Sequence, residues 1–199
     1  MKKSFLLIVM LVTSTIFAQE NEGLKGTWWA AGQLSFDSEK TGDLKTSSNF
    51  ILPIAGYFIA PTTTVGLGIG TINSETKNGS TVVAESTAFV VKPLIRKYWN
   101  VSGNLYFYGQ ASIPFVSGKD KVSNDKFNSF GLELTPGLDL IVNKWMTIEA
   151  SFDILSITSV TETPNAGEKT TSFGFNANPL NSVSDRGFGS LRVGVKFLF

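Results

Sequence analysis

The sequence has no cysteine and no histidine among its 199 residues. Without cysteine, a disulfide framework and thiol chemistry are excluded. Without histidine, the chain lacks the commonest general base and metal ligand, so the usual serine–histidine and histidine–metal sites cannot be built. We therefore expect a protein that is not an enzyme, with no catalytic residues, no bound metal and no cofactor.

Charged side chains are scarce as well. They make up 17% of the chain, against roughly 25% in ordinary soluble domains. The formal net charge is +1 and no basic cluster is present, which gives no support for nucleic-acid binding. Beyond the first 18 residues there is no apolar run of about 20 residues, so a membrane-spanning helix is not expected there.

The first 18 residues have the form of a secretory signal peptide. Lys2 and Lys3 give a short basic region, and the apolar run at residues 5–12 is too short to cross a bilayer comfortably. Cleavage after Ala18 would leave residues 19–199 as one domain, and a membrane-anchor helix is the alternative. An exported chain with few charges and no later membrane helix favours another route into lipid, a β-barrel.

The rest of the chain alternates between apolar and polar residues, with Val, Ile, Thr and aromatic residues prominent. This pattern predicts eight strands, each long enough to cross a bilayer at a tilt, which takes about 9–11 residues. The predicted strands are residues 26–37, 48–60, 63–74, 82–97, 103–116, 128–142, 145–157 and 187–199.

The predicted connections alternate in length. Three are short, whereas the polar segments 38–47, 75–81, 117–127 and 158–186 are longer, and Asn78 with Gly79 reads as a tight turn. Short turns at one end and long polar loops at the other are typical of an outer-membrane barrel. We therefore predict an all-β fold, an eight-stranded antiparallel up-and-down transmembrane β-barrel of meander topology with both termini in the periplasm.

Aromatic residues gather at the predicted periplasmic end, where amphipathic rings prefer the level of the lipid headgroups. The alternative is that the tryptophans are ordinary core residues. The predicted girdle consists of Trp28, Trp29, Tyr57, Tyr98, Trp99 and Trp145.

The polar face of the predicted strands is rich in Gly, Ser, Thr, Tyr and Gln, which suits a crowded interior. A soluble lipocalin-like barrel would instead place a solvated Lys and Glu face outward. If the polar face is inward, the lumen holds four bases and four acids in two balanced layers. The lower layer would contain Arg96, Asp139, Glu149 and Lys196, and the upper one Lys92, Glu133, Asp153 and Arg192.

Eight strands enclose a bore that side chains can fill, so these charges predict a plugged, ion-paired lumen. A gated ion path is the alternative. Glu149 and Asp153 share a face, as paired catalytic carboxylates do, but opposite charges on neighbouring strands favour structural pairing.

Two further segments leave alternatives open. Both faces of the second predicted strand are apolar. If its phase follows Pro53, then Leu52, Ile54, Gly56 and Phe58 point inward, which predicts either a hydrophobic ligand path or a local packing patch. The long 158–186 segment could bind a protein partner, since loops often carry function, or form a lid or a hairpin that extends the last two strands.

Several motifs resemble those of the small eight-stranded outer-membrane β-barrel proteins of the OmpA/OmpX/OmpW-like, porin-family type. They are PIAGYFIA and PLIRKYW before short turns, PGLDLIV in the sixth predicted strand and VGVKFLF at the end of the chain. With the signal peptide, the resemblance covers essentially all of residues 24–199, and the Pro-x-x-Gly-Tyr-Phe form is most similar to versions from Bacteroidetes-type bacteria.

The resemblance implies location in the outer membrane of a Gram-negative cell envelope, among outer-membrane lipid and lipopolysaccharide. It also implies insertion by the barrel-assembly machinery, which would read a C-terminal signal at Val193, Val195, Phe197 and Phe199. It does not imply one activity. Our leading hypothesis is a structural or interaction-mediating barrel, and the alternative is a narrow channel for ions or small hydrophobic compounds.

Overall fold

The computed structural model describes residues 23–177 and 192–199, and these form one antiparallel sheet that closes on itself. No helix in these two ranges is long and apolar enough to cross a membrane. The strands are β1 (Trp28–Thr41), β2 (Leu44–Ala60), β3 (Thr63–Asn78), β4 (Thr81–Ser102), β5 (Leu105–Ser112), β6 (Phe115–Asp120), β7 (Lys126–Asn143), β8 (Met146–Ser151), β9 (Leu155–Thr163), β10 (Thr170–Asn176) and β11 (Arg192–Leu198).

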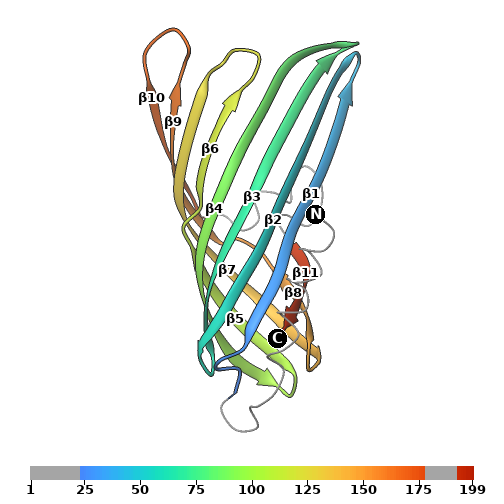
Figure 1. Cartoon of the computed structure of the whole chain (residues 1–199), viewed down its shortest axis with the longest axis vertical. Helices are drawn as coiled ribbons and strands as arrows, with labels where there is room; N and C mark the ends of the chain where they lie inside the picture. Colours follow the sequence, from blue (N-terminus) through green and yellow to red (C-terminus); the bar gives the residue numbers. More distant parts are fainter. Residues whose placement is uncertain (1–22, 178–191) are drawn as a thin grey trace, which may run out of the picture.

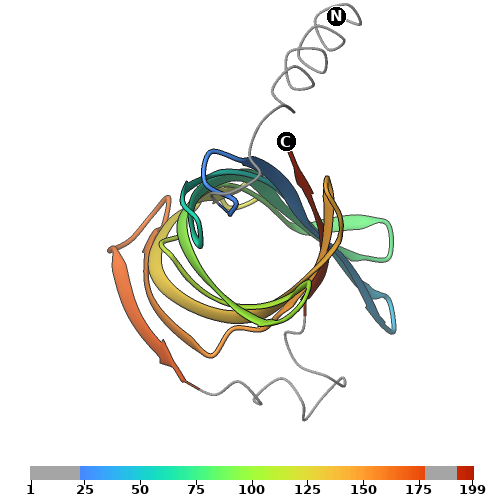
Figure 2. The same ribbon diagram turned by 90° about the horizontal axis from the view of Figure 1, so that it is seen from below.

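The sheet is a closed barrel with eight strand positions. β1 to β4 pair in order, β5 and β6 lie end to end between β4 and β7, and β8 and β9 lie end to end on the other side of β7. β11 then joins β8 to β1 and completes the ring, which Figure 2 shows from below. The predicted eight-stranded antiparallel meander is therefore confirmed, with two of its strands split in two and with β10 as an additional strand beside β9.

We call the end of the barrel that carries the β1–β2, β3–β4, β6–β7 and β9–β10 turns the upper end, as in Figure 1. The strands reach much further towards it than predicted. The connections there are only residues 42–43, 79–80, 121–125 and 164–169. The two tightest turns place Gly42 and Gly79 at φ of +61° and +60°, where glycine is favoured.

The prediction of long polar loops at this end was therefore wrong for most of the residues assigned to them. These residues are polar, but they continue the strand pairing, as Ser38 with Ser47 and Thr46 with Thr76 show. Their side chains also meet across the ladder, since Thr46 Oγ1 and Thr76 Oγ1 lie within hydrogen-bond distance at 3.2 Å. Backbone pairing does not require an apolar face, so loss of hydrophobicity did not mark the strand ends.

The wall is fully paired only in its lower part. β1 pairs with β11 from Trp29 to Ala31, and below this the backbones of Trp28 and Phe199 exchange hydrogen bonds of 3.1 and 2.8 Å. From Gly32 to Thr41, no strand among the described residues pairs with this edge of β1. β10 pairs with β9 alone and diverges from the ring (Figure 2).

Candidate functional site

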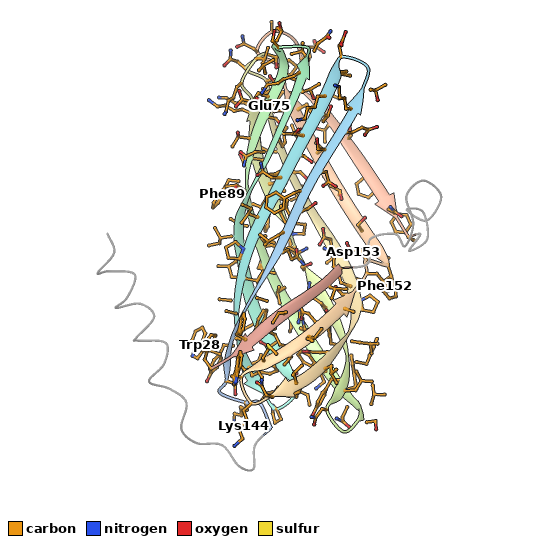
Figure 3. All side chains as sticks on the ribbon, turned by 90° about the vertical axis from the view of Figure 1, so that its right-hand side faces the viewer. Trp28, Glu75, Phe89, Lys144, Phe152 and Asp153 are labelled. Carbon is orange, nitrogen blue, oxygen red and sulfur yellow. The ribbon has the colours of Figure 1, made fainter. Side chains whose placement is uncertain are left out.

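The outer face of the barrel is a continuous apolar band. Strand alternation turns aliphatic and aromatic side chains outward on every wall position, and Figure 3 shows Trp28 and Phe89 projecting from the wall at its lower and middle levels. Towards the top the band gives way to outward residues that are mostly Ser, Asn, Thr and charged, although Leu44, Val82, Val83 and Val122 are exposed near the upper turns. The upper limit of the continuous band is marked by Phe36, Ile51, Ile69, Phe89, Phe115 and Phe130.

The predicted 158–186 loop contributes to this band. β9 and β10 form a hairpin in it, and the register Phe130–Ser159–Phe173 puts Phe173 on the outward face. Phe173 and Phe175 are both exposed and extend the apolar surface. Residues 178–186 of the predicted loop lie outside the described residues, as do the predicted signal peptide and the start of the predicted last strand, 187–191.

The structure separates the six predicted girdle residues into two groups. Trp28 packs against Tyr57 at 5.0 Å between ring centroids, Trp99 packs against Phe107, and Trp145 stacks on Phe197. Trp28, Trp99 and Trp145 are each about half exposed at the lower end of the outer face.

Trp29 and Tyr98, in contrast, point into the lumen, and their assignment to the girdle was wrong. They are only 1% and 4% exposed. Each is adjacent in sequence to an outward tryptophan, so strand alternation must send it to the opposite face. Trp29 Nε1 donates a hydrogen bond of 2.6 Å to Thr64 Oγ1 inside the barrel.

All eight predicted lumen charges point inward and meet as four ion pairs in two layers. In the lower layer, Arg96 Nη1 lies 2.6 Å from Glu149 Oε2, and Lys196 contacts Asp139. In the upper layer, Lys92 Nζ lies 2.5 Å from Glu133 Oε2, and Arg192 contacts Asp153. Each layer contains equal numbers of bases and acids.

Arg96 occupies the centre of the lower layer. Its Nε and Nη2 both donate to Gln110 Oε1, at 3.0 and 2.8 Å, and its Nη1 also donates to the Tyr98 hydroxyl at 3.1 Å. The guanidinium carbon lies 4.2 Å from the ring centroid of Tyr108 and 5.3 Å from that of Trp29. Hydrogen-bond acceptors and ring faces therefore surround a cation that is itself buried.

The second lower base, Lys196, shares these partners. Its Nζ donates to the Tyr98 hydroxyl at 2.9 Å and lies 4.9 Å from the Tyr98 ring centroid. Tyr98 therefore links Arg96, from the middle of the chain, with Lys196, from its last strand. The sequence prediction missed Tyr108, Gln110 and the inward role of Tyr98, although all three have the inward phase of their strands.

Glycines make room for the bulky lumen rings. A Cβ at Gly56 would lie 2.3 Å from Trp29 Cε2, and a Cβ at Gly137 would lie 2.4 Å from Tyr108 Cζ. Gly66, in the run GLGIG, also faces Trp29, at 3.0 Å. These glycines permit the close packing that fills the bore.

An apolar cluster occupies the lumen wall above and beside the lower ion pairs. Its members on β2 are Leu52, Ile54 and Phe58, all buried, with Val90 and Leu94 from β4. These residues match the inward phase predicted for the second strand. They pack against one another, and Phe50, Ile72 and Val116 continue the apolar surface upward.

A cavity of about 230 Å³ lies beneath the lower ion pairs. Lys196, Asp139 and Tyr98 line it, and Leu24 lies at its edge. Asp139 Oδ1 and Thr147 Oγ1 are buried there without a hydrogen-bond partner among the described residues. Buried polar atoms of this kind usually bind water, and this cavity has room for it.

No group of three or more metal-ligating side chains occurs in the part of the chain that the structure describes. The lumen charges instead pair with one another, although Asp139 Oδ1 and Arg192 Nε have no hydrogen-bond partner among the described residues. Two of the carboxylates also accept hydroxyl hydrogen bonds, from Ser112 Oγ to Glu133 Oε2 at 3.3 Å and from Thr135 Oγ1 to Asp153 Oδ1 at 2.6 Å.

No family model and no curated protein matches this sequence. Among solved structures, the chain is similar to the outer membrane protein OprG from Pseudomonas aeruginosa. The TM-score is 0.50 and the sequence identity is 16%, and the match covers 89% of this chain and 98% of OprG. A likeness at this identity shows a shared barrel fold over nearly the whole of both chains.

Proposed function

We propose that this chain is an integral outer-membrane β-barrel protein whose lumen is closed to ions by the four ion pairs. It would serve the envelope as a structural barrel or through contacts made at its upper end. The single observation that carries the proposal is the combination of an apolar outer face with a charge-balanced, filled interior. A soluble barrel has the reverse arrangement.

The outer band supports placement in a bilayer. Exposing so many large apolar side chains to water would be costly, at roughly 25 cal/mol for each Å² of apolar surface. In the lower wall the sheet closes through the pairing of β1 with β11, and closure of this kind satisfies backbone hydrogen bonds as a lipid environment requires. The tryptophans at the lower end would mark the periplasmic interface, with both termini of the barrel on that side, and a cleaved signal peptide would direct export.

The plug supports closure to ions. Arg96, Lys92 and Lys196 are all buried and each contacts a carboxylate, so a passing ion would meet neither an open path nor an uncompensated charge. An isolated ion in such a low-dielectric bore pays a large desolvation penalty. The lumen would therefore remain closed unless a pair is removed.

Reconstitution into lipid vesicles tests the membrane and closure claims separately. We expect the folded protein to migrate differently on gels before and after heating, and to be recovered with the vesicles. Vesicles loaded with a self-quenching anionic dye should retain it as long as protein-free vesicles do. A mature protein that stays soluble without detergent would refute membrane placement, and rapid dye release by the wild type would refute closure.

A second candidate function is passage of small hydrophobic compounds through the upper lumen and out through the wall. One observation favours this function. The apolar residues Leu52 and Phe50 on β2 pair with Gln33 and Ser35 on β1, and at this level the other edge of β1 has no partner strand among the described residues, so the apolar part of the lumen lies beside an unpaired part of the wall. Loss of hydrophobic-compound uptake on Leu52→Arg, with the barrel still folded, would support it. Unchanged uptake would count against it.

The proposed partners follow from the same placement. The barrel-assembly machinery would insert the chain by recognising the C-terminal strand, where Val193, Val195 and Phe197 face outward. A protein partner at the upper end remains a proposal for the β9–β10 hairpin and its turn, residues 164–169.

A further inference from the structure

Beyond the apolar boundary, the outer face of the wall is rich in lysine. Two of these residues, Lys119 on β6 and Lys126 on β7, stand directly opposite each other in the strand register. Both are exposed, and both lie on the outward face, four residues beyond Phe115 and Phe130 on their own strands. They therefore sit just above the level at which the apolar band ends.

This placement is unfavourable for the isolated protein. Like charges directly across an antiparallel pair repel and destabilise the sheet. Within the described ranges, neither Lys119 nor Lys126 forms a hydrogen bond or an ion pair. The outward acid on the neighbouring strand, Glu85, is already paired with Lys121, with 2.5 Å between Oε1 and Nζ. The two ammonium groups thus lack a paired counter-charge among the described residues.

The two lysines border a shallow groove of about 380 Å³ on the outer wall. Hydroxyl groups lie along it, from Thr71, Thr87 and Ser117, and the side chain of Phe89 forms its apolar side. Figure 3 shows Phe89 projecting outward from the wall. The groove therefore combines cationic and hydroxyl donors at its upper part with an aromatic surface that belongs to the apolar band.

We propose that this groove binds the phosphate of a phosphorylated lipid of the outer leaflet, with the phosphate between Lys119 and Lys126. The inference rests on the proposed membrane placement and adds a specific lipid site to it. A phosphate oxygen accepts hydrogen bonds from both ammonium groups and from a neighbouring hydroxyl, which removes the repulsion between the two cations. The acyl chain of the same lipid lies along Phe89 and the apolar band below.

The geometry favours a lipid over a free anion. A free phosphate would need only the lysines and hydroxyls, whereas the groove continues onto Phe89, which has no favourable contact to offer an inorganic ion. The site also lies at the height where headgroups would meet the barrel if the band spans the hydrocarbon layer. Basic residues near an anionic membrane surface contribute about 1 kcal/mol each.

The test uses the full-length barrel in a neutral detergent and fluorescent lipid A carrying both of its phosphates. The double variant Lys119→Gln/Lys126→Gln should weaken binding about thirty-fold, which corresponds to roughly 2 kcal/mol for two lysines. Lys40→Gln/Lys45→Gln is the matched control, because these lysines are also directly opposite each other, on β1 and β2, but do not border the groove. The control should bind lipid A as the wild type does.

Three results would overturn the proposal. They are equal loss in both double variants, unchanged binding in Lys119→Gln/Lys126→Gln, and equally tight binding of dephosphorylated lipid A. Displacement of lipid A by millimolar inorganic phosphate would reassign the groove to a free anion. Lys119→Arg/Lys126→Arg should retain binding. Heat-modifiable migration, measured first for every variant, separates loss of this site from failure of the membrane-barrel proposal itself.

Discussion

Removing one partner of the most buried ion pair should destabilise the barrel strongly. The side chains of Lys196 and Asp139 are only 1% and 4% exposed. In the variant Lys196→Met, the Asp139 carboxylate would stay buried without its cation, and its Oδ1 already lacks a hydrogen-bond partner among the described residues. Breaking a buried pair in this way costs about 3–5 kcal/mol.

The same substitution at the surface provides the comparison. Lys121 pairs with Glu85 at the upper end, but the two side chains are 46% and 37% exposed. Water and salt screen such pairs, and their contribution is about 0–1 kcal/mol. Lys121→Met should therefore change stability little, although it removes the same type of side chain from a lysine–carboxylate ion pair.

Equilibrium urea unfolding of vesicle-bound protein, followed by tryptophan fluorescence, measures the difference. With a slope of about 2 kcal/mol per molar urea, Lys196→Met should lower the midpoint by roughly 2 M, and Lys121→Met by less than about 0.5 M. The double variant Lys196→Met/Asp139→Leu should recover much of the loss, because no unpaired charge remains. Equal midpoints for Lys196→Met and Lys121→Met would refute the claim that the lumen pair is desolvated.

Three further outcomes follow from particular contacts. Gly56→Val should force Trp29 out of its position at a cost of about 1–3 kcal/mol, seen as a lower urea midpoint and a shifted tryptophan emission; an unchanged spectrum would contradict the packing. The backbone N–H of Ser123 donates a hydrogen bond to Asp120 and lowers the pKa of this carboxyl group. The ionised Asp120 therefore stabilises the β6–β7 turn above the pKa that it has in the unfolded chain, and this stabilisation is lost as the pH falls through its folded pKa. Asp120→Asn should thus speed proteolysis of residues 121–125 at neutral pH. A proteolysis rate equal to that of the wild type would argue against stabilisation of the turn by the Asp120 carboxylate. Deleting Phe199 should slow membrane insertion more than it lowers the stability of the inserted barrel, whereas normal insertion would exclude a signal role for this residue.

Much of the wall could be predicted because period-two alternation is a local property of the sequence. Lys92 and Arg96 have the same phase as their neighbours on β4, so their inward direction followed directly from alternation. Their partners could be anticipated from the position of each acid along its strand, since antiparallel register is set by the short lower turns.

The errors have physical causes of the same kind. The girdle was predicted from the position of aromatic residues along the barrel axis, and Trp28 and Trp29 lie at nearly the same position. Only the alternation of side chains along β1 distinguishes them, because it places the Trp29 ring inside the barrel. The upper strand ends could not be read from hydropathy, because Ser38 and Thr46 each pair with the neighbouring strand through their backbones regardless of polarity. The unpaired edge of β1 depends on contacts between distant strands, for which a single sequence carries no local signal.

Single-channel recording in a planar bilayer tests the plug most directly. The wild-type barrel should give no steady current, because Arg96 and Glu149 neutralise and fill the lower lumen. The variant Arg96→Ala/Glu149→Ala removes both side chains without leaving an unpaired charge, and it should open discrete conductance steps. Steady wild-type current, or a double variant that folds and stays silent, would contradict the account.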